Sequence, residues 1–350
     1  ACPDGWRTGE NTGSEERQMN MESMTVSVII PVYNASATLG ACLDSLNRQT
    51  IQRFELLFID DSSTDRSLDI LMSYAEQYST GDFVVKVLRH ERNRGVAAAR
   101  NTGLEYATGE YVYYVDADDF IEPDTLECLL KEVQEKELDI VGHEWFLTFK
   151  SDERYMKQPL FVTPDEALRQ MMCGVMRWNL WLFLVRRSLY VENNIRFIEG
   201  MNMGEDMMVM MKLFACAKRV TIINRAFYHY GQSNSGSLTK TYSAEHIRQV
   251  TNNVQEAEQF ISASSYAGLL SEFIPLLKLN IKLPLLITDD ESRYRQWTEW
   301  FPEANGYVMK NKRLPLRTRL LQLAAVKRYD FLLKLYYRFV FKLVYGVIYK

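Results

Sequence analysis

The alternation of short apolar runs with amphipathic segments is the feature that most constrains the fold of this 350-residue chain. Apolar runs typical of buried strands lie at residues 26–31, 54–59, 83–88, 111–115 and 138–141. Between them, apolar residues recur at helical spacing in segments 39–46, 68–75, 96–107 and 126–133. Repeated strand–helix units with short connections predict an α/β fold with a mostly parallel sheet between helices and right-handed crossovers.

The same pattern divides the chain into three predicted parts. Residues 1–24 have no apolar period and are rich in Gly, Glu and Asn, so we expect a disordered leader. Residues 25–237 begin with the α/β pattern and continue, after about residue 149, as a less regular stretch with a helix beginning near Gly204. Residues 238–350 are mostly helical by pattern and are expected to form a C-terminal helical extension.

Composition narrows the class of protein. Hydrophobic residues make up 47% of the chain and charged residues 25%, values typical of a folded soluble domain. The formal net charge of −4 gives no reason to expect a nucleic-acid partner. The charge is unevenly spread, because residues 306–350 contain eleven Lys and Arg but one acid, Asp330. The sequence therefore predicts an acidic body with a basic tail.

The cysteines and the apolar segments favour a cytoplasmic protein. The five cysteines are scattered and form no C-x-x-C pair, which argues against a disulfide framework or a zinc site. No window reaches eighteen uninterrupted apolar residues, as a membrane-spanning helix would require. The first residues are polar where a signal peptide would have an apolar core.

Polar side chains follow three of the predicted parallel strands, at the edge where ligands bind in open α/β sheets. Strand ends and helix caps favour such residues for structural reasons alone, but three strands deliver them together. The acidic members are Asp60, Asp61, Asp65, Asp116, Asp118 and Asp119. Six carboxylates on one rim would repel one another unless a divalent cation such as Mg²⁺ or Mn²⁺ lay between them. Asp116 and Asp118 form a D-x-D pair whose side chains share one face of an extended strand end.

Two common nucleotide-binding motifs are absent from this sequence. No G-x-G-x-x-G follows the first strand, and no G-x-x-x-x-G-K-[ST] occurs, which weighs against a dehydrogenase and a P-loop NTPase. Tyr33, after the first strand, offers an aromatic face, and an Asp after the second strand offers an acceptor for a base N–H. These residues predict a different kind of nucleobase pocket.

Three segments carry a family resemblance: VSVIIPVYNA, FELLFIDDSSTDRS and NRGVAAARNTGLEYATGEYVYYVDADD. Over residues 25–237 the chain resembles the family 2 glycosyltransferases with the GT-A fold, which build bacterial capsule, exopolysaccharide or lipopolysaccharide. The resemblance implies that Pro31, Tyr33 and Asp61 surround the base of a nucleotide-sugar, most often uridine. It also implies that Arg100 lies near the nucleotide, although a surface arginine on an amphipathic helix is the alternative. Ser62 departs from the family pattern, which usually has Gly there.

The resemblance further assigns the D-x-D and E-D motifs. It implies that Asp116 touches the ribose, that Asp118 touches the metal-bound diphosphate, and that both hold a Mg²⁺ or Mn²⁺ ion. Glu205 and Asp206 resemble the E-D pair that supplies the general base of inverting enzymes, although helix capping by an acidic pair would also explain them. Asp206 is the predicted base and Glu205 the next candidate.

The sequence leaves three residues near the predicted site with two interpretations each. Trp178 and Trp181 lie where family members shape the acceptor side, but two Trp three residues apart are also typical of core packing on one helix face. His229 lies in a Tyr-His-Tyr segment that resembles the part closing over the diphosphate, but a lone His is more often structural.

The basic tail, residues 310–350, has a helical pattern that suggests attachment to a membrane surface. Its apolar residues Leu332, Leu335, Tyr336, Phe339, Leu343 and Val347 alternate with Lys334, Arg338 and Lys342. Such a helix can lie at the inner face of the cell membrane, with basic groups on anionic lipid. The alternative is a helix that packs on the rest of the protein.

The sequence therefore predicts a metal-dependent, inverting glycosyltransferase. Its donor would be a nucleotide-diphosphate sugar and its acceptor a saccharide or lipid-linked saccharide. A sugar nucleotidyltransferase is the enzymatic alternative, but it would carry a Gly-rich, basic phosphate loop where this chain has Pro31-Val32-Tyr33-Asn34. A non-catalytic nucleotide-sugar-binding member of the fold is the other alternative.

Overall fold

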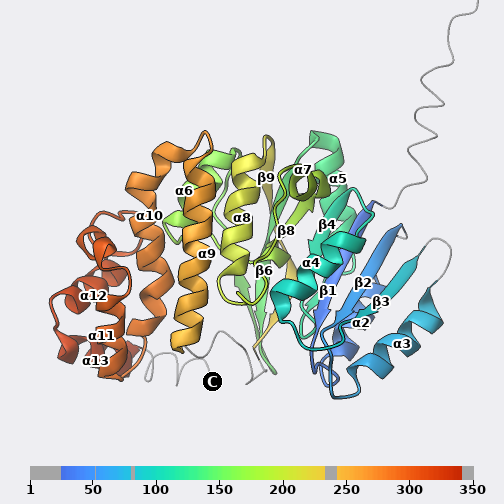
Figure 1. Ribbon diagram of the computed structural model, residues 1–350, viewed down its shortest axis with the longest axis horizontal. Helices are drawn as coiled ribbons and strands as arrows, with labels where there is room; N and C mark the ends of the chain where they lie inside the picture. The colour runs from blue at the N-terminus through green and yellow to red at the C-terminus, as the bar shows by residue number, and fades with distance from the viewer. Residues whose placement is uncertain (1–24, 52, 80–82, 233–242, 341–350) are drawn as a thin grey trace, which may run out of the picture.

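The computed structural model describes residues 25–51, 53–79, 83–232 and 243–340. The predicted leader and the predicted domain boundary at Ser237 therefore lie outside the described residues. Figure 1 shows a central sheet with helices packed against it, and a group of C-terminal helices beside the sheet.

The first half of the sheet is parallel, as the strand–helix alternation predicts. Its order is β3–β2–β1–β4. The strands are β1 (Val26–Val32), β2 (Phe54–Asp60), β3 (Val84–Arg89) and β4 (Tyr111–Tyr114). The intervening helices are α2 (Leu39–Asn47), α3 (Ser67–Tyr78) and α4 (Val96–Tyr106), and α5 (Thr125–Lys136) follows β4 and the short β5 (Phe120–Ile121). Apolar side chains on both faces bury β1 and β2, as a doubly covered sheet requires.

The second half of the sheet adds short antiparallel strands to this parallel core. Four of the eight pairings among the described strands are antiparallel. The remaining strands are β6 (Ile140–Thr148), β7 (Glu153–Met156), β8 (Phe183–Arg186) and β9 (Val220–Gly231). β8 runs antiparallel between β4 and β6, while β9 pairs with β6 in parallel and with β5 in antiparallel orientation. The short strands lie in a region where the sequence pattern is irregular, which is why their direction could not be predicted.

Close packing of α4 on β1 fixes the helix that carries Arg100. A Cβ added to Gly103 of α4 would lie 2.3 Å from Cγ2 of Ile29, so only glycine permits this approach.

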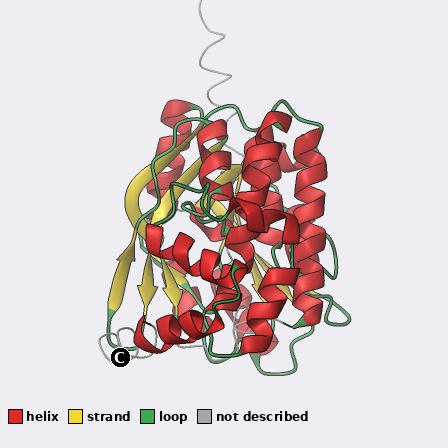
Figure 2. Ribbon diagram, turned by 90° about the vertical axis from the view of Figure 1, so that its left-hand side faces the viewer, coloured by secondary structure: helices red, strands yellow, loops and turns green. Residues whose placement is uncertain are grey.

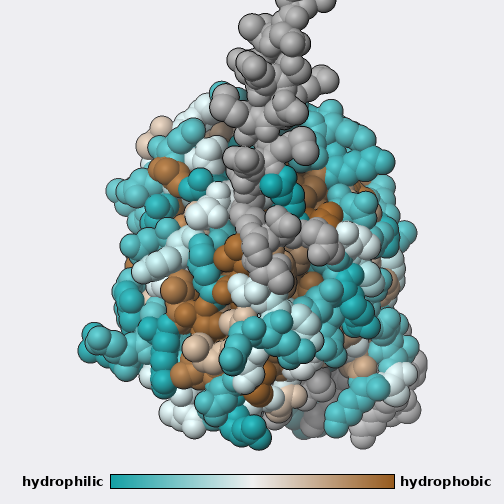
Figure 3. Space-filling view, turned by 90° about the vertical axis from the view of Figure 1, so that its right-hand side faces the viewer, coloured by the Kyte–Doolittle hydropathy of each residue, from teal (hydrophilic) through white to brown (hydrophobic). Residues whose placement is uncertain are grey.

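β3 forms the outer edge of the sheet, and Figure 3 shows this side of the molecule as a hydrophobic area bordered by hydrophilic side chains.

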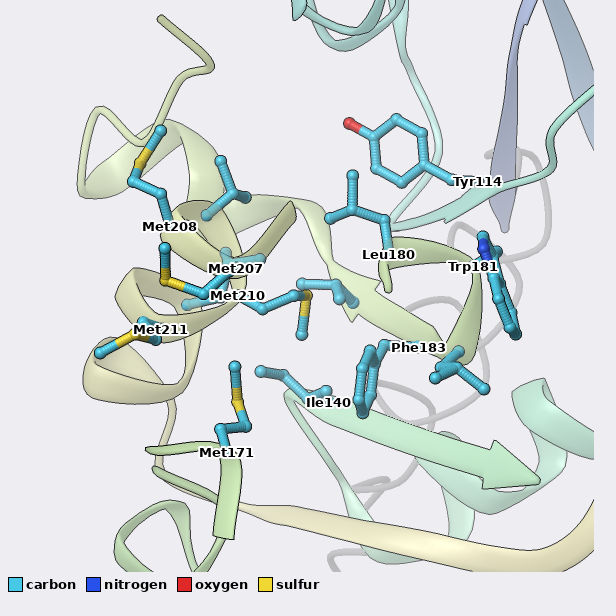
Figure 4. Close-up of a cluster of buried hydrophobic side chains, with 14 of the residues drawn as sticks. Tyr114, Ile140, Met171, Leu180, Trp181, Phe183, Met207, Met208, Met210 and Met211 are labelled. Atoms are coloured by element: carbon cyan, nitrogen blue, oxygen red, sulfur yellow. The ribbon is translucent and has the colours of Figure 1, made fainter. Parts of the chain in front are cut away.

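The methionine-rich helix α8 (Glu205–Cys216) packs in the core. Figure 4 shows its Met207, Met208, Met210 and Met211 beside Met171 of α6 (Pro164–Met172), with Ile140 and Phe183 from the sheet nearby. All four methionines of α8 are at most 1% exposed.

The C-terminal region is helical, as predicted, and packs against α8 through α9 (Figures 1 and 2). Its α-helices are α9 (Ala244–Ser262), α10 (Ala267–Lys282), α11 (Glu291–Glu299), α12 (Leu316–Val326) and α13 (Asp330–Tyr336). This region also contains the short helical segments η3 (Leu283–Leu286) and η4 (Pro302–Tyr307). Earlier in the chain, η1 (Leu180–Leu182) and α7 (Arg187–Glu192) lie on either side of β8. Within the described ranges, no helix combines the length and apolar character needed to cross a bilayer.

The described part of the tail is not one continuous helix. Arg328 adopts a φ of 60°, in the left-handed region, and separates α12 from α13. Leu333 is fully buried, and Lys334 forms an ion pair with Glu291 at 2.6 Å. Part of the tail therefore packs on α11, while Lys342, Leu343 and Val347 lie outside the described residues.

Candidate active site

Side-chain hydrogen bonds join the loops after β1 and β2. Asn34 accepts a hydrogen bond from the Thr64 N–H through its side-chain oxygen, and its own N–H donates to the Ser63 hydroxyl. Asp65 accepts hydrogen bonds from the Ser67 N–H and hydroxyl and so caps the start of α3. These contacts hold Tyr33, which is 52% exposed, beside the end of β2.

Ser62 has a φ of 62°, in the left-handed region. Glycine adopts this conformation without steric cost, which explains why glycine is usual in the family motif at this position. The turn after β2 keeps this backbone shape with serine.

The two carboxylates at the end of β2 already have partners in the protein. Asp60 accepts a hydrogen bond from the Ser63 N–H and lies 3.3 Å from Arg89 Nε. Asp61 accepts from the N–H groups of Arg94 and Gly95 at 2.8 and 2.7 Å, and it lies 2.7 Å from the His90 ring. Asp61 is 3% exposed, so most of its surface is occupied by these contacts.

The carboxylates after β4 are arranged differently. Asp116 and Asp118 are partly exposed, whereas Asp119 is buried and accepts hydrogen bonds from the Tyr228 hydroxyl and the Gly231 N–H. The same Tyr228 hydroxyl accepts a hydrogen bond from the Asp116 N–H at 3.0 Å. Tyr228 of β9 therefore holds the D-x-D turn in shape through its hydroxyl. The sequence pointed to the Tyr-His-Tyr segment that contains Tyr228 but not to this supporting contact.

Like charges crowd this turn. Burial is the main cause that raises the pKa of Asp116, and the nearby Asp118 and Asp206 raise it further, although Arg100 opposes them. Burial and the charges of Asp116 and Asp118 hold the pKa of Asp119 well above its usual range. The carboxylates of this turn therefore repel one another when they are ionised.

Arg100 is a buried residue that joins the two predicted motifs. Its guanidinium donates to Glu205 at 2.7 Å and to Asp206 at 2.6 Å, and it lies 3.7 Å from Asp116. It is 5% exposed, which excludes the surface-arginine alternative. Burial and the charge of Asp206 raise the pKa of Glu205. Protonation of Glu205 would leave the Arg100 guanidinium with two carboxylates, Asp206 and Asp116, as its anionic neighbours.

Asp206 has one carboxylate oxygen committed to Arg100. Its other oxygen accepts a long hydrogen bond of 3.4 Å from the Leu180 N–H. Gly204, with a φ of 78°, is the N-cap residue directly before α8 and brings the acidic pair to this position. The Asp206 carboxylate therefore lies within reach of both the D-x-D motif and the segment around Trp181.

Aromatic side chains line this segment. Trp181 stacks on Tyr228 with a centroid distance of 4.2 Å and lies 5.6 Å from the Tyr230 ring. The core-packing alternative is confirmed for Trp181, although the two Trp side chains share no helix face, because Trp181 belongs to the short helix η1 and Trp178 lies outside any helix. Trp178 is partly buried against the core.

His229 faces away from the D-x-D turn, because side chains alternate along β9. Its ring is stacked between Phe120 and Phe146, with centroid distances of 4.2 and 4.7 Å. Its nitrogens lie 2.7 Å from Glu122 and 2.9 Å from Glu153. The structure therefore places His229 in a structural contact between strands.

The six aspartates do not form one cluster, because Asp60, Asp61 and Asp65 have partners of their own in the loops after β1, β2 and β3. Across the ranges that the structure describes, no three or more His, Cys, Asp and Glu side chains form a group arranged to hold a metal. Asp116 and Asp118 nevertheless fit a hard divalent ion, which proteins often hold with one or two carboxylates while substrate phosphates complete the shell.

Comparison with known proteins establishes the family. The sequence profile of glycosyl transferase family 2 matches residues 27–214, and the chain therefore belongs to this family of glycosyltransferases. The glycosyltransferase EpsJ of Bacillus subtilis is 30% identical over 275 residues, which cover 75% of this chain and 77% of EpsJ. This match extends beyond the region of the family profile.

Two further proteins are informative. The poly(ribitol-phosphate) beta-glucosyltransferase of Bacillus spizizenii is 32% identical over 59% of this chain, which corresponds to 32% of that protein. The crystal structure of S. aureus TarS 1–349 with UDP-GlcNAc has a TM-score of 0.66 at 22% identity, covering 90% of this chain and 92% of that chain. The structural similarity confirms the GT-A fold.

Proposed function

We propose that this glycosyltransferase moves a sugar from a nucleoside-diphosphate donor to a hydroxyl acceptor, with inversion at the anomeric carbon. The observation that carries this proposal is the Arg100 bridge, which brings Asp206 and Asp116 to one guanidinium. A base beside the donor-binding motif is what a single in-line displacement requires.

The donor would bind across the ends of β1, β2 and β4. Tyr33 and Pro31 would contact the base, and Asp61 would accept one N–H from it. Asp116 would contact the ribose. Arg100 is buried and would support Asp116 through their ion pair at 3.7 Å. A bound UDP-GlcNAc in the similar TarS structure supports a uridine donor for this chain.

A divalent cation fits the D-x-D turn because Asp116 and Asp118 are like charges close together, and their repulsion adds to the effect of burial on the pKa of Asp116. Asp116 and Asp118 would hold Mg²⁺ or Mn²⁺. When bound, the ion neutralises charge on the departing nucleoside diphosphate. The protein's own residues hold this turn in shape through the Tyr228 hydroxyl.

Asp206 would act on the acceptor. Arg100 fixes one carboxylate oxygen, and the other can accept the proton of the acceptor hydroxyl as its oxygen bonds to the anomeric carbon and the bond to the diphosphate breaks. The partly buried Tyr230, which is supported from the core by Trp181, would contact the acceptor sugar. A single displacement inverts the configuration.

The acceptor would be a saccharide or lipid-linked saccharide of a cell-surface polymer. The named activity of the poly(ribitol-phosphate) relative supports this class. We place the reaction in the cytoplasm, at the inner face of the cell membrane.

The decisive experiment is a panel of nucleotide-sugars tested by Mn²⁺-dependent thermal shift, followed by NMR of the product of the best donor. UDP-sugars should stabilise the protein more than GDP- or ADP-sugars, and the product should have inverted anomeric configuration. A retained configuration, or no stabilisation by any nucleotide-sugar, would contradict the proposal.

Attachment to anionic lipid would involve the surface of α12 and α13, which combines apolar and basic side chains without an exposed acid in the described residues 306–340. Its exposed large apolar residues are Leu316, Leu320, Tyr329, Phe331, Leu332, Leu335 and Phe339. Its exposed cations are Lys312, Arg313, Arg317, Lys327, Arg328 and Arg338. Basic groups attract anionic headgroups and apolar side chains enter the acyl boundary.

Vesicle co-sedimentation tests this surface with point variants, because truncation would remove the buried Leu333. Phe331 is 74% exposed, so Phe331→Glu should weaken binding to phosphatidylglycerol vesicles roughly tenfold, as loss of one buried aromatic side chain predicts. Met72→Glu, on exposed α3, is the matched control. Equal loss in both variants, or equal binding to neutral vesicles, would contradict the proposed membrane surface.

A further inference from the structure

His90 is a buried residue that directly follows β3. The parallel register pairs Asp60 with Arg89, so the next residues, Asp61 and His90, leave the sheet side by side. The His90 N–H donates to the Asp60 carbonyl at 2.9 Å, which fixes its backbone. His90 is 7% exposed and its Nδ1 lies 2.7 Å from Asp61 Oδ1.

The contacts of the ring define its orientation. An ionised carboxylate can only accept, so Nδ1 must carry the hydrogen that it donates to Asp61. Nε2 lies 2.9 Å from the hydroxyl of Thr102 on α4, which can donate to it. His90 therefore bridges α4 and the Asp61 carboxylate.

The acceptor capacity of Asp61 is nearly filled. An ionised carboxylate has about four lone-pair sites. Oδ1 accepts from His90 and from the Arg94 N–H, and Oδ2 accepts from the Gly95 N–H. Among the described residues no other donor contacts this carboxylate, which leaves one acceptor position on Oδ2.

The Gly95 donor cannot move easily. Gly95 has a φ of 86°, and a Cβ there would lie 2.3 Å from the side chain of Asn202. The Asn202 side chain in turn accepts a hydrogen bond from the Ala97 N–H. Backbone and ring together thus hold both oxygens of Asp61 in place.

We propose that His90 is a positioning residue that leaves the Asp61 carboxylate with one acceptor position for the base. The site would then select a nucleobase that offers one ring N–H. Uracil offers one such group, N3–H. Guanine presents N1–H beside N2–H₂ and would leave one donor without a partner, which is costly at a buried contact. This inference rests on the proposed nucleotide-sugar function and adds how its base would be chosen.

The test is calorimetric titration of the full chain with UDP, GDP and pyrophosphate, each with Mn²⁺. His90→Leu removes the donor to Asp61, whereas His90→Asn keeps an N–H close to the position of Nδ1. His90→Leu should weaken UDP binding roughly tenfold, the scale of one hydrogen bond to a charged group. Pyrophosphate binding should change less than about twofold, and His90→Asn should stay within about threefold of wild type for UDP. With substrate, KM for the donor should rise and kcat should change little.

Three results would overturn the inference. UDP and pyrophosphate affinity could fall together, His90→Leu and His90→Asn could lose UDP affinity equally, or the preference for UDP over GDP could persist in a folded His90→Leu variant. If His90→Leu does not fold, Thr102→Val removes the outer partner of the ring, and an unchanged preference for UDP would then overturn it. Failure of the proposed function looks different, because wild-type protein would then bind no nucleoside diphosphate.

Discussion

The acidic ends of β2 and β4, which are separated in the sheet by β1 alone, differ in how their charge is balanced. After β2, Asp60 and Asp61 are matched by Arg89, His90 and three backbone N–H groups. After β4, Asp116 is raised in pKa by burial and by its acidic neighbours, with Arg100 as its nearest cation at 3.7 Å. The carboxylates of the first end have cationic and backbone partners within the protein, and Asp61 keeps one acceptor position, whereas the like charges of the second end are where we propose that a divalent cation binds.

The largest expected effect is on catalysis by the β4 end. Asp118→Asn should lower the transfer rate by at least about 10³-fold, because a missing metal ligand removes several kcal/mol of charge stabilisation on the leaving group. Steady-state transfer assays with Mn²⁺ check this, with the exposed Asp69→Asn variant as the matched control. Full wild-type activity in EDTA would remove the proposed difference between the two strand ends.

The next effect concerns the base that shares Arg100 with this turn. Asp206→Asn should lower kcat by about 10²-fold or more while donor affinity stays near wild type, the usual scale for loss of a general base. Single-turnover kinetics and donor titration separate the two quantities. A near-normal kcat would transfer the role to another group, and Glu205→Gln is the variant that tests Glu205.

Opposite signs in stability would sharpen the comparison. Asp118→Asn relieves repulsion and should raise the free energy of unfolding of metal-free protein by about 1 kcal/mol. Asp60→Asn weakens the pairing with Ser63 and Arg89 and should lower it by about 1 kcal/mol. Urea denaturation in EDTA measures both, and changes of the same sign would contradict the proposed difference in charge balance.

A further expected effect is a dependence of stability on pH. Glu205 has an ordinary pKa of 4.5, which burial and Asp206 raise in the folded state. The folded protein then binds a proton that the unfolded chain has released, so stability should fall as pH rises above 4.5, by at most about 1.4 kcal/mol per pH unit. Glu205→Gln should flatten this slope in urea denaturation of metal-free protein. An identical slope in wild type and variant would assign the effect elsewhere.

Much of the site could be predicted because strand ends and motifs are local features. The apolar runs of β1, β2 and β4 placed Tyr33, Asp61 and Asp116 on one edge. The antiparallel β8 was not predictable, since it is short and its direction depends on partners far away in the sequence.

The balance of charge was the other property hidden from the sequence. Counting six aspartates suggested one cluster, but which of them already have partners depends on contacts such as those of His90 and Tyr228, which join residues 29 to 112 positions apart. Arg100 could be linked to the nucleotide by its motif, but its ion pairs with Glu205 and Asp206 required the packing of α4 against α8 residues. Long-range polar contacts leave no periodic signal in a sequence.

The most direct test of the account is Mn²⁺ binding measured by calorimetry in the presence of saturating UDP. Wild-type protein and Asp60→Asn should bind one Mn²⁺ with similar affinity, because the β2 end needs no external cation. Asp118→Asn should lose at least about tenfold in Mn²⁺ affinity. Equal Mn²⁺ binding by wild type and Asp118→Asn, or a loss confined to Asp60→Asn, would contradict the assignment of the cation to the β4 end.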